Sequence, residues 1–304
     1  MKNYFKEICS FFLIRRSKEQ KQRFFEYVSN EFEPGVVKKE VLENKHENIV
    51  IGDIESAKVI VTAHYDTPAT SLVPNLMMPA NKYLSLAYHI AYPLVLALFA
   101  LAVAFGIAVP AKWELYYIMA LYLVLYYALF FGATRLVTNK NNVNDNTSGV
   151  ATVLSIAKQS LSKKVAFVLF DNEEKGLLGS KAMKKKYKEL LNDKLVVNFD
   201  CVANGKEIVF IVKEKAENFA EYELLKKSFA SNANFKVHFL PFKKCTGNSD
   251  YKNFEAGIGV CACKKGKCVK FYTGKIHTNK DTVGDDENIE YLTSSMLEFI
   301  SLMN

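Results

Sequence analysis

Two long runs without a charged side chain constrain the fold of this chain more than any other feature. The first extends from Tyr83 to Ala111 and the second from Leu115 to Thr134. A helix needs about 20 apolar residues to cross the hydrocarbon core of a bilayer, and each run reaches that length. The link Lys112-Trp113-Glu114, followed by Tyr116 and Tyr117, is typical of an aromatic membrane interface. The runs therefore predict a transmembrane helical hairpin over residues 83–134 rather than two core helices of a soluble domain.

The charges that flank the runs predict how such a hairpin is oriented. Lys82, Arg135 and Lys140 lie on the side shared with the rest of the chain, whereas the tip offers a single lysine beside Glu114. The basic segment 15–23 adds positive charge on the shared side. By the positive-inside rule, this asymmetry predicts two membrane spans and a cytoplasmic domain. Six unevenly spaced cysteines, too few for a secreted disulfide scaffold, agree with a reducing compartment.

The overall charge argues against one class of partner. The chain has 40 Lys and Arg against 32 Asp and Glu, a formal net charge of +8. Nucleic-acid-binding proteins gather such an excess on one face, often with interleaved aromatic residues. Here the lysines are scattered, so we expect no nucleic-acid partner. The excess is interpreted as a solvated surface, with attraction to a membrane surface as the alternative.

The rest of the chain alternates between strand and helix patterns. Residues 1–33 carry apolar side chains at helical spacing, which predicts amphipathic helices that pack on the sheet or, alternatively, lie on a membrane. Strands alternating with helices predict a three-layer αβα domain around a mixed central sheet. We thus expect an amphipathic segment over 1–33, one α/β domain formed by 34–82 and 135–304, and the inserted hairpin over 83–134. The expected strands are Val36–Leu42, Asn48–Gly52, Lys58–His64, Val165–Phe170, Leu195–Val202, Glu207–Val212, Lys236–Leu240, Gly257–Cys263 and Cys268–Tyr272, the last two as a hairpin, and the expected helices are Gly149–Leu161, Gly176–Leu191, Glu217–Ser231 and Asn288–Leu302.

The strongest strand ends on residues that can bind a metal. Val59–Ala63 is an apolar, β-branched run, and His64 and Asp66 follow it at the carboxyl edge of the expected sheet. One residue separates the two, so the Asp66 carboxylate is expected to orient the His64 ring.

Further acidic or imidazole residues recur at strand ends or in the loops that follow. Each alone fits a structural role, such as a helix cap or a turn residue. Together they form a mixed histidine and carboxylate set, which suits zinc, and two adjacent metals need a bridging carboxylate. The set consists of His64, Asp66, Asp145, Glu173, Glu174, Asp200 and His277.

These residues stand in strings that resemble a known family. The strings His64-Tyr65-Asp66, Asp145–Gly149 (DNTSG), Phe170–Ser180 (FDNEEKGLLGS), Asn198–Asp200 (NFD) and Ile276–Thr282 (IHTNKDT) are similar, in the same order, to those of the co-catalytic dizinc aminopeptidases of metallopeptidase family 28. The string Glu173–Ser180 is the most specific of them. Asn248-Ser249-Asp250 is similar to the Ser-Asp segment of that family.

The resemblance implies a zinc-exopeptidase fold, two zinc ions and peptide substrates. One zinc would be bound by His64 and Asp200 and the other by Glu174 and His277. Asp145 would bridge both ions, and Asp66 would orient His64. Glu173 would be the general base, taking a proton from the attacking water and passing it to the leaving amine. Spare carboxylate capacity near the metals would recognise the free α-amine of a peptide.

Three features depart from the family pattern. Relatives often have a tyrosine near the last histidine to support the oxyanion, whereas Ile276 precedes His277 here, and Tyr272, Tyr251 and Tyr65 are the candidates. The hydrophobic hairpin separates His64 from Asp145. Four cysteines near the C-terminal strands could bind a metal or form a disulfide, but their spacing favours ordinary strand and turn thiols; they are Cys245, Cys261, Cys263 and Cys268.

Three functions follow from this interpretation. The first is a membrane-anchored dizinc aminopeptidase. The second is a glutaminyl-cyclase-like acyltransferase with one zinc, and the third is an inactive peptidase-like scaffold in the membrane. Because the chain leaves the sheet just after His64 and returns just before Asp145, we also expect the rim of the site to face the bilayer.

Overall fold

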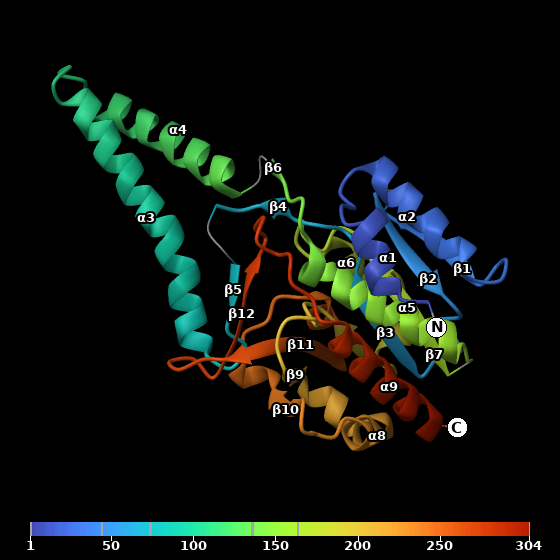
Figure 1. Ribbon diagram of the computed structural model, residues 1–304. Coiled ribbons are helices and arrows are strands. Elements are labelled where there is room, and N and C mark those ends of the chain that lie inside the picture. The colour runs from blue at the N-terminus through green and yellow to red at the C-terminus, as the bar shows by residue number, and fades with distance from the viewer. Residues whose placement is uncertain (1, 44, 73–74, 135–136, 163, 304) are drawn as a thin grey trace.

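The computed structural model describes residues 2–43, 45–72, 75–134, 137–162 and 164–303 (Figure 1). Its centre is a mixed sheet in which the strand order is β1-β2-β7-β3-β8-β11-β12-β5, with β9 on β11 and β10 on β9. The four central strands β7, β3, β8 and β11 run parallel. The strands are β1 (Val37–Leu42), β2 (His46–Ile51), β3 (Val59–His64), β4 (Ala69–Thr70), β5 (Asn75–Met77), β6 (Val137–Thr138), β7 (Val165–Phe170), β8 (Leu195–Phe199), β9 (Glu207–Val212), β10 (Lys236–Pro241), β11 (Gly257–Lys265) and β12 (Phe271–Ile276).

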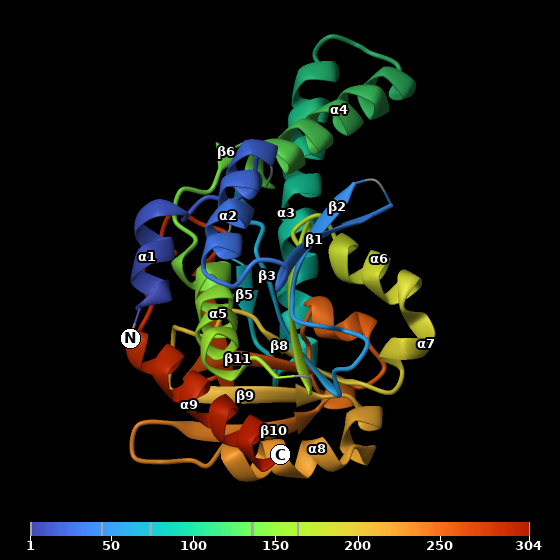
Figure 2. The same cartoon turned by 90° about the vertical axis from the view of Figure 1, so that its right-hand side faces the viewer.

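Helices cover both faces of this sheet, which confirms the expected αβα layers (Figure 2). Successive residues of a strand point to opposite faces, so Val59 and Val61 pack against one helical layer and Ile60 against the other. The helices are α1 (Tyr4–Phe11), α2 (Lys18–Asn30), α3 (Lys82–Ala108), α4 (Leu115–Thr134), α5 (Gly149–Ser160), α6 (Leu178–Lys186), α7 (Lys188–Leu191), α8 (Ala220–Ser228) and α9 (Asp286–Leu302), with short turns η1 (Val143–Ser148), η2 (Glu214–Asn218), η3 (Phe242–Lys244) and η4 (Asp250–Asn253).

The N-terminal helices α1 and α2 belong to the main hydrophobic core. Ile8, Phe24 and Val28 have no exposed surface, and the Phe24 ring stacks on Tyr65 at 5.8 Å between centroids. A capping box formed by Ser17 and Gln20 begins α2. Their apolar face is therefore covered by protein, as the first of the two interpretations of residues 1–33 predicts.

Helices α3 and α4 project away from the αβα domain (Figure 1). Both are long and apolar enough to cross a membrane, and only 11% and 6% of their apolar windows are buried. Small residues on α3, Ala104 and Ala108, pack against Ile118 of α4 near the tip. The core helix of a soluble protein is mostly buried, so these exposed helices do not resemble one.

Some expected element boundaries are wrong, for local reasons. The expected strand Leu195–Val202 ends at Phe199, because Cys201 has a left-handed φ of 58°. The expected helix Gly176–Leu191 starts at Leu178 and breaks at Tyr187, whose hydroxyl donates to Glu40 of β1. The expected strand Cys268–Tyr272 instead begins at Phe271 and continues to Ile276, and it also pairs with β5.

Candidate metal centre

The seven predicted site residues come from separate loops that meet at one edge of the sheet. His64 ends β3, and Asp66 follows it two residues later. Asp145 lies in the turn η1 that precedes α5, and Asp200 directly follows β8. The remaining three are in the loops that follow β7 and β12: Glu173, Glu174 and His277. All parallel strands of the centre point their carboxyl ends at this edge, which is where α/β folds place their sites.

Asp145 joins two groups of candidate ligands. Its Oδ1 lies 3.3 Å from Nε2 of His64, and its Oδ2 lies 3.0 Å from Nε2 of His277. Asp200 completes the first group, with Oδ1 at 3.6 Å from His64 Nε2. Glu174 completes the second, with Oε2 at 3.4 Å from His277 Nε2. Each oxygen of one buried carboxylate thus faces a different histidine.

This arrangement fits a pair of zinc ions. Two ligand atoms at about 2.1 Å from a tetrahedral zinc lie about 3.4 Å apart, close to the observed separations of 3.0 to 3.6 Å. Buried oxygens also lack partners here: within the described residues, Glu174 Oε1 and Asp200 Oδ1 accept no hydrogen bond. Buried carboxylate oxygens are normally satisfied, so these two are available for a cation.

Asp66 makes separate contacts through its main chain and its side chain. Its carboxylate Oδ1 is 3.7 Å from His64 Nδ1, too far for a hydrogen bond, and its backbone carbonyl oxygen contacts that nitrogen at 3.1 Å instead. The carboxylate accepts the backbone N–H groups of Glu173 at 2.9 Å and Glu174 at 3.3 Å. Asp66 therefore orients His64 with its main chain and fixes the following acidic pair with its side chain.

Two residues that the sequence did not single out position Asp145. Asp281 accepts the backbone N–H of Asn144 on one oxygen and that of Asp145 on the other, both at 3.0 Å. Asn146 donates to the Phe199 carbonyl and accepts from the N–H of Gly149. Asp281 lies in the string Ile276–Thr282, so the motif contained the signal although no role was assigned.

Two buried basic residues of the N-terminal segment support the centre from behind. Arg15 has no exposed surface, and its side chain donates to the carbonyls of Tyr65 and Phe12 and to the Thr147 hydroxyl. Lys21 pairs with Asp171, two residues before Glu173, at 2.5 Å. Neither was predicted, because a basic residue in an amphipathic segment ordinarily faces solvent.

Burial and mutual repulsion perturb the ionisation of the cluster. Burial raises the pKa of Glu173 well above its usual range and that of Glu174 to about 8, although His64 and His277 oppose the effect. Burial also raises the pKa of Asp250, which accepts a hydrogen bond from Ser180, to about 7. Burial alone would lower the pKa of His277, but the charges of Glu174 and Asp145 raise it to about 9. A site of this kind stabilises cations strongly.

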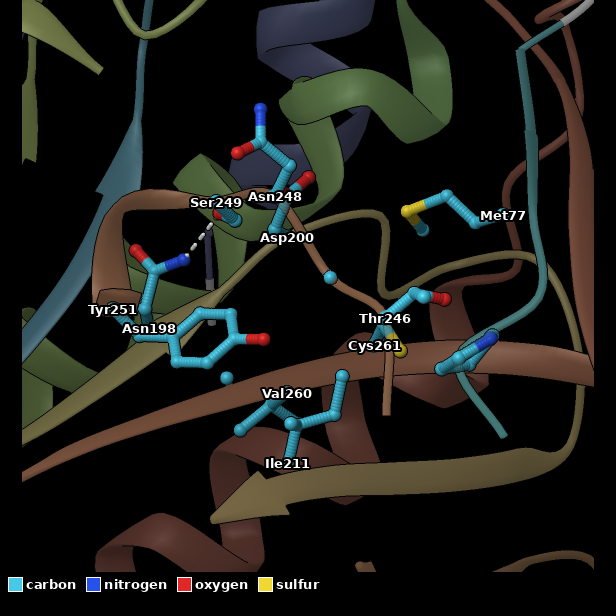
Figure 3. Close-up of a pocket in the computed structure, with 13 residues that line it drawn as sticks. Met77, Asn198, Asp200, Ile211, Thr246, Asn248, Ser249, Tyr251, Val260 and Cys261 are labelled. Carbon is cyan, nitrogen blue, oxygen red and sulfur yellow. Dashed lines mark hydrogen bonds between the residues drawn. The ribbon is translucent and has the colours of Figure 1, made fainter. Parts of the chain in front are cut away.

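A small apolar pocket adjoins Asp200 (Figure 3). Its volume is about 30 Å³, room for about two water molecules. The Tyr251 hydroxyl points into it and, among the described residues, has no hydrogen-bond partner. Tyr65, by contrast, donates to the Glu47 carbonyl. The apolar part of the wall is formed by Met77, Pro79, Ile211, Val260 and Cys261.

The cysteines are free thiols. Cys245, Cys261 and Cys263 are buried and Cys268 is exposed. The sulfur atoms of Cys261 and Cys263 lie 3.8 Å apart on β11, a contact rather than a bond. The contact agrees with the interpretation as ordinary strand and turn thiols.

Both ends of the hairpin are tied to the candidate centre. The backbone N–H of Ser71 donates to the carbonyl of His277 at 2.6 Å, and that of Leu72 donates to the carbonyl of Ala133 at 2.8 Å. Before α3, the strand β5 pairs with β12, which leads into His277. The Thr246 N–H, on the pocket wall, donates to the Pro79 carbonyl at 2.9 Å.

Comparisons with known proteins agree with this geometry. The profile described as peptidase family M28 matches residues 134–300, more than half of the chain, and includes every predicted site residue except His64 and Asp66. No curated protein sequence matches the chain.

Several solved structures share its fold. A zinc-dependent exopeptidase from Parabacteroides distasonis is 16% identical, covers 98% of this chain and 95% of its own, and has a TM-score of 0.58. The glutaminyl cyclase of Porphyromonas gingivalis is 13% identical, with 99% and 96% covered and a TM-score of 0.58. The LapA aminopeptidase of Legionella pneumophila is 14% identical, with 98% and 67% covered and a TM-score of 0.54.

Proposed function

The chain belongs to peptidase family M28, and on that premise we propose that it is a membrane-anchored aminopeptidase that uses two zinc ions. The observation that carries the proposal is the placement of Asp145, whose two oxygens face His64 and His277 at 3.3 and 3.0 Å. One zinc would be held by His64, Asp145 and Asp200, and the other by Asp145, Glu174 and His277. The zinc ions, when bound, supply Lewis-acid polarisation of the scissile carbonyl and a lowered pKa for water.

The side chains around this centre divide the remaining work. The Glu173 carboxylate lies with ligand atoms of His64 and Glu174 within 4.8 Å of one another. In that position it takes a proton from the attacking water and passes it to the leaving amine. Burial raises the pKa of Glu173 above its usual range, which makes its carboxylate a stronger base than an exposed one. The Tyr251 hydroxyl, which points into the pocket beside Asp200, is the best placed of the three candidate tyrosines to donate to the substrate.

The pocket suggests which N-terminal residues are released. The wall is apolar and the cavity of about 30 Å³ is small, so an alanine side chain fits without rearrangement, whereas leucine and phenylalanine require movement of Met77 or Tyr251. We therefore expect highest turnover on peptides that begin with a small apolar residue.

Membrane anchoring rests on α3 and α4, whose apolar surfaces lie outside the αβα core. Spans of 27 and 20 residues are about 40 and 30 Å long, enough for the hydrocarbon core. With the flanking lysines on the domain side, the domain would be cytoplasmic.

The proposal is tested with protein purified in detergent and assayed on a panel of aminoacyl fluorogenic substrates. We expect zinc-dependent release of N-terminal residues, fastest for alanine, and loss of turnover after chelation with recovery on zinc addition. A zinc-loaded protein that is inert on the whole panel contradicts the proposal.

A second candidate reaction is cyclisation of N-terminal glutamine, because a glutaminyl cyclase covers 99% of this chain at a TM-score of 0.58. That reaction expels ammonia without consuming water. A peptide with N-terminal glutamine distinguishes the two: release of free glutamine supports the peptidase, and a pyroglutamyl product supports the cyclase.

A further inference from the structure

The stretches of chain that surround the base of the hairpin carry lysines and no acidic residues. Three stretches form this region, and none contains Asp or Glu: 67–113, 115–144 and 256–280. The chain as a whole has 32 acidic residues, so their absence from these three stretches, which leave out only Glu114 at the tip of the hairpin, is a strong asymmetry. Eight exposed lysines of these stretches, here named the lysine rim, are Lys82, Lys140, Lys264, Lys265, Lys267, Lys270, Lys275 and Lys280.

The fold brings the rim to both arms of the hairpin. The end of β11 and the turn that leads to β12 carry Lys264 to Lys270, and the N–H of Lys270 donates to the side chain of Asn81, the residue before α3, at 3.0 Å. Figure 1 shows this turn beside the start of α3. At the other arm, the Asn141 side chain donates to the Asn279 carbonyl at 2.7 Å, which places the neighbours Lys140 and Lys280 near the end of α4.

The rim lysines also differ from the other lysines of the surface. Many lysines elsewhere pair with an acid, as Lys185 does with Glu43 and Lys206 does with Asp285. No lysine of the rim forms an ion pair within the described part of the chain. Unneutralised cations on neighbouring stretches repel one another, so this surface favours a negatively charged partner.

From this arrangement we propose that the lysine rim binds the headgroups of anionic phospholipids where the hairpin enters the bilayer. The proposal rests on the membrane anchoring proposed above and adds a lipid class to it. Clustered lysines next to a membrane span are suited to anionic headgroups, and each one near the surface strengthens the association about fivefold.

This contact has a consequence for the metal centre. Strand β12 (Phe271–Ile276) connects Lys270 to His277, and the Ser71 N–H donates to the His277 carbonyl. Headgroups bound by the rim therefore fix the level of the site above the bilayer, so that chain ends close to the membrane surface reach the pocket most easily.

The experiment reconstitutes the full chain in vesicles of equimolar phosphatidylcholine and phosphatidylglycerol, extracts it in mild detergent and measures the lipids that co-purify. Wild-type protein should retain phosphatidylglycerol several-fold over phosphatidylcholine. The variant K264Q/K265Q/K267Q/K270Q should lose most of this preference. The matched control K215Q/K226Q/K227Q/K236Q, with the same charge change on exposed lysines of η2, α8 and β10, should keep it.

Each outcome bears on one proposal. Equal retention of the two lipids by wild-type protein, or an equal loss in both variants, overturns the lysine rim as a lipid site. The proposal is also overturned if millimolar inorganic phosphate abolishes the retention of phosphatidylglycerol while added salt leaves that retention unchanged. Such a result indicates a site for free phosphate. Failure of wild-type protein to enter the vesicles at all instead contradicts the membrane anchoring.

Discussion

The substitution Asp66→Asn separates the two ways in which Asp66 can act. The carboxylate accepts the N–H groups of Glu173 and Glu174, whereas His64 contacts the backbone carbonyl of residue 66. Asparagine retains the shape, the backbone and one acceptor oxygen. It loses the charge and turns an amide donor toward one of the two N–H groups. The acidic pair should shift while His64 stays in place.

The size of the effect follows from one lost bond. A hydrogen bond to a charged acceptor contributes about 1.5–3 kcal/mol. If this whole free energy is lost from the stabilisation of the transition state, because Glu173 is no longer aligned, kcat falls about 10- to 150-fold. The zinc at His64 should remain, because the carbonyl contact to His64 survives, whereas the zinc at Glu174 should be held less firmly once that residue shifts.

The assay compares kcat and zinc per chain for the wild type, Asp66→Asn and a control, Asp53→Asn. Asp53 is exposed, accepts the backbone N–H of Glu55 at 3.0 Å, and lies in the turn between β2 and β3, at the opposite end of β3 from His64. The control should keep both quantities. If Asp66→Asn loses both zinc ions in proportion to activity, the carboxylate acts through His64 and the reasoning is refuted.

Three further results are expected. Zinc binding to the metal-free protein should tighten as the pH rises toward about 9. The pKa of His277 is raised to about 9, so below that pH the ring is protonated and must release its proton before it binds zinc. Calorimetry in buffers of different ionisation enthalpy measures this proton release, and a zinc affinity that does not depend on pH contradicts the prediction. Arg15→Met should lower the free energy of unfolding, measured by urea titration, by about 2–6 kcal/mol, because it leaves the carbonyls of Tyr65 and Phe12 unpaired. The side chain of Arg16 is partly exposed, so the control Arg16→Met should change the free energy of unfolding little. The hairpin can be removed by an Asn-Gly turn that replaces residues 71–136 and joins Thr70 to Val137, which are Cα partners in the β4–β6 pair. This variant should leave the membrane fraction and keep its zinc. A variant that still sediments with membranes disproves the anchoring role of α3 and α4.

The sequence predicted best where a local pattern decides the structure. Strands β7 and β9 match their expected ranges, because a continuous apolar run between polar turns has few alternatives. The site residues were found because they stand in short strings at strand ends. The structure brings them together as expected, and their roles as ligands are part of the proposal.

What the sequence could not give depends on distant contacts. Strands β4 and β5 are two and three residues long and exist through pairing with β6 and β12, far along the chain. Arg15 and Lys21 stand in an amphipathic segment, and only the packing of α1 and α2 on the domain buries them. The role of the Asp66 carboxylate depended on which atoms of His64 and the acidic pair come within reach, which spacing alone does not specify.

The most direct test of the central claim is the number of zinc ions per chain, measured together with turnover, in wild-type protein and in Glu173→Gln. Glu173 is not assigned as a ligand, so both proteins should contain two zinc ions per chain. Turnover on an alanyl substrate should fall at least about 100-fold in Glu173→Gln, because the proton transfers lose their base. A single zinc per chain in the wild type, or near-normal turnover in Glu173→Gln, contradicts the account.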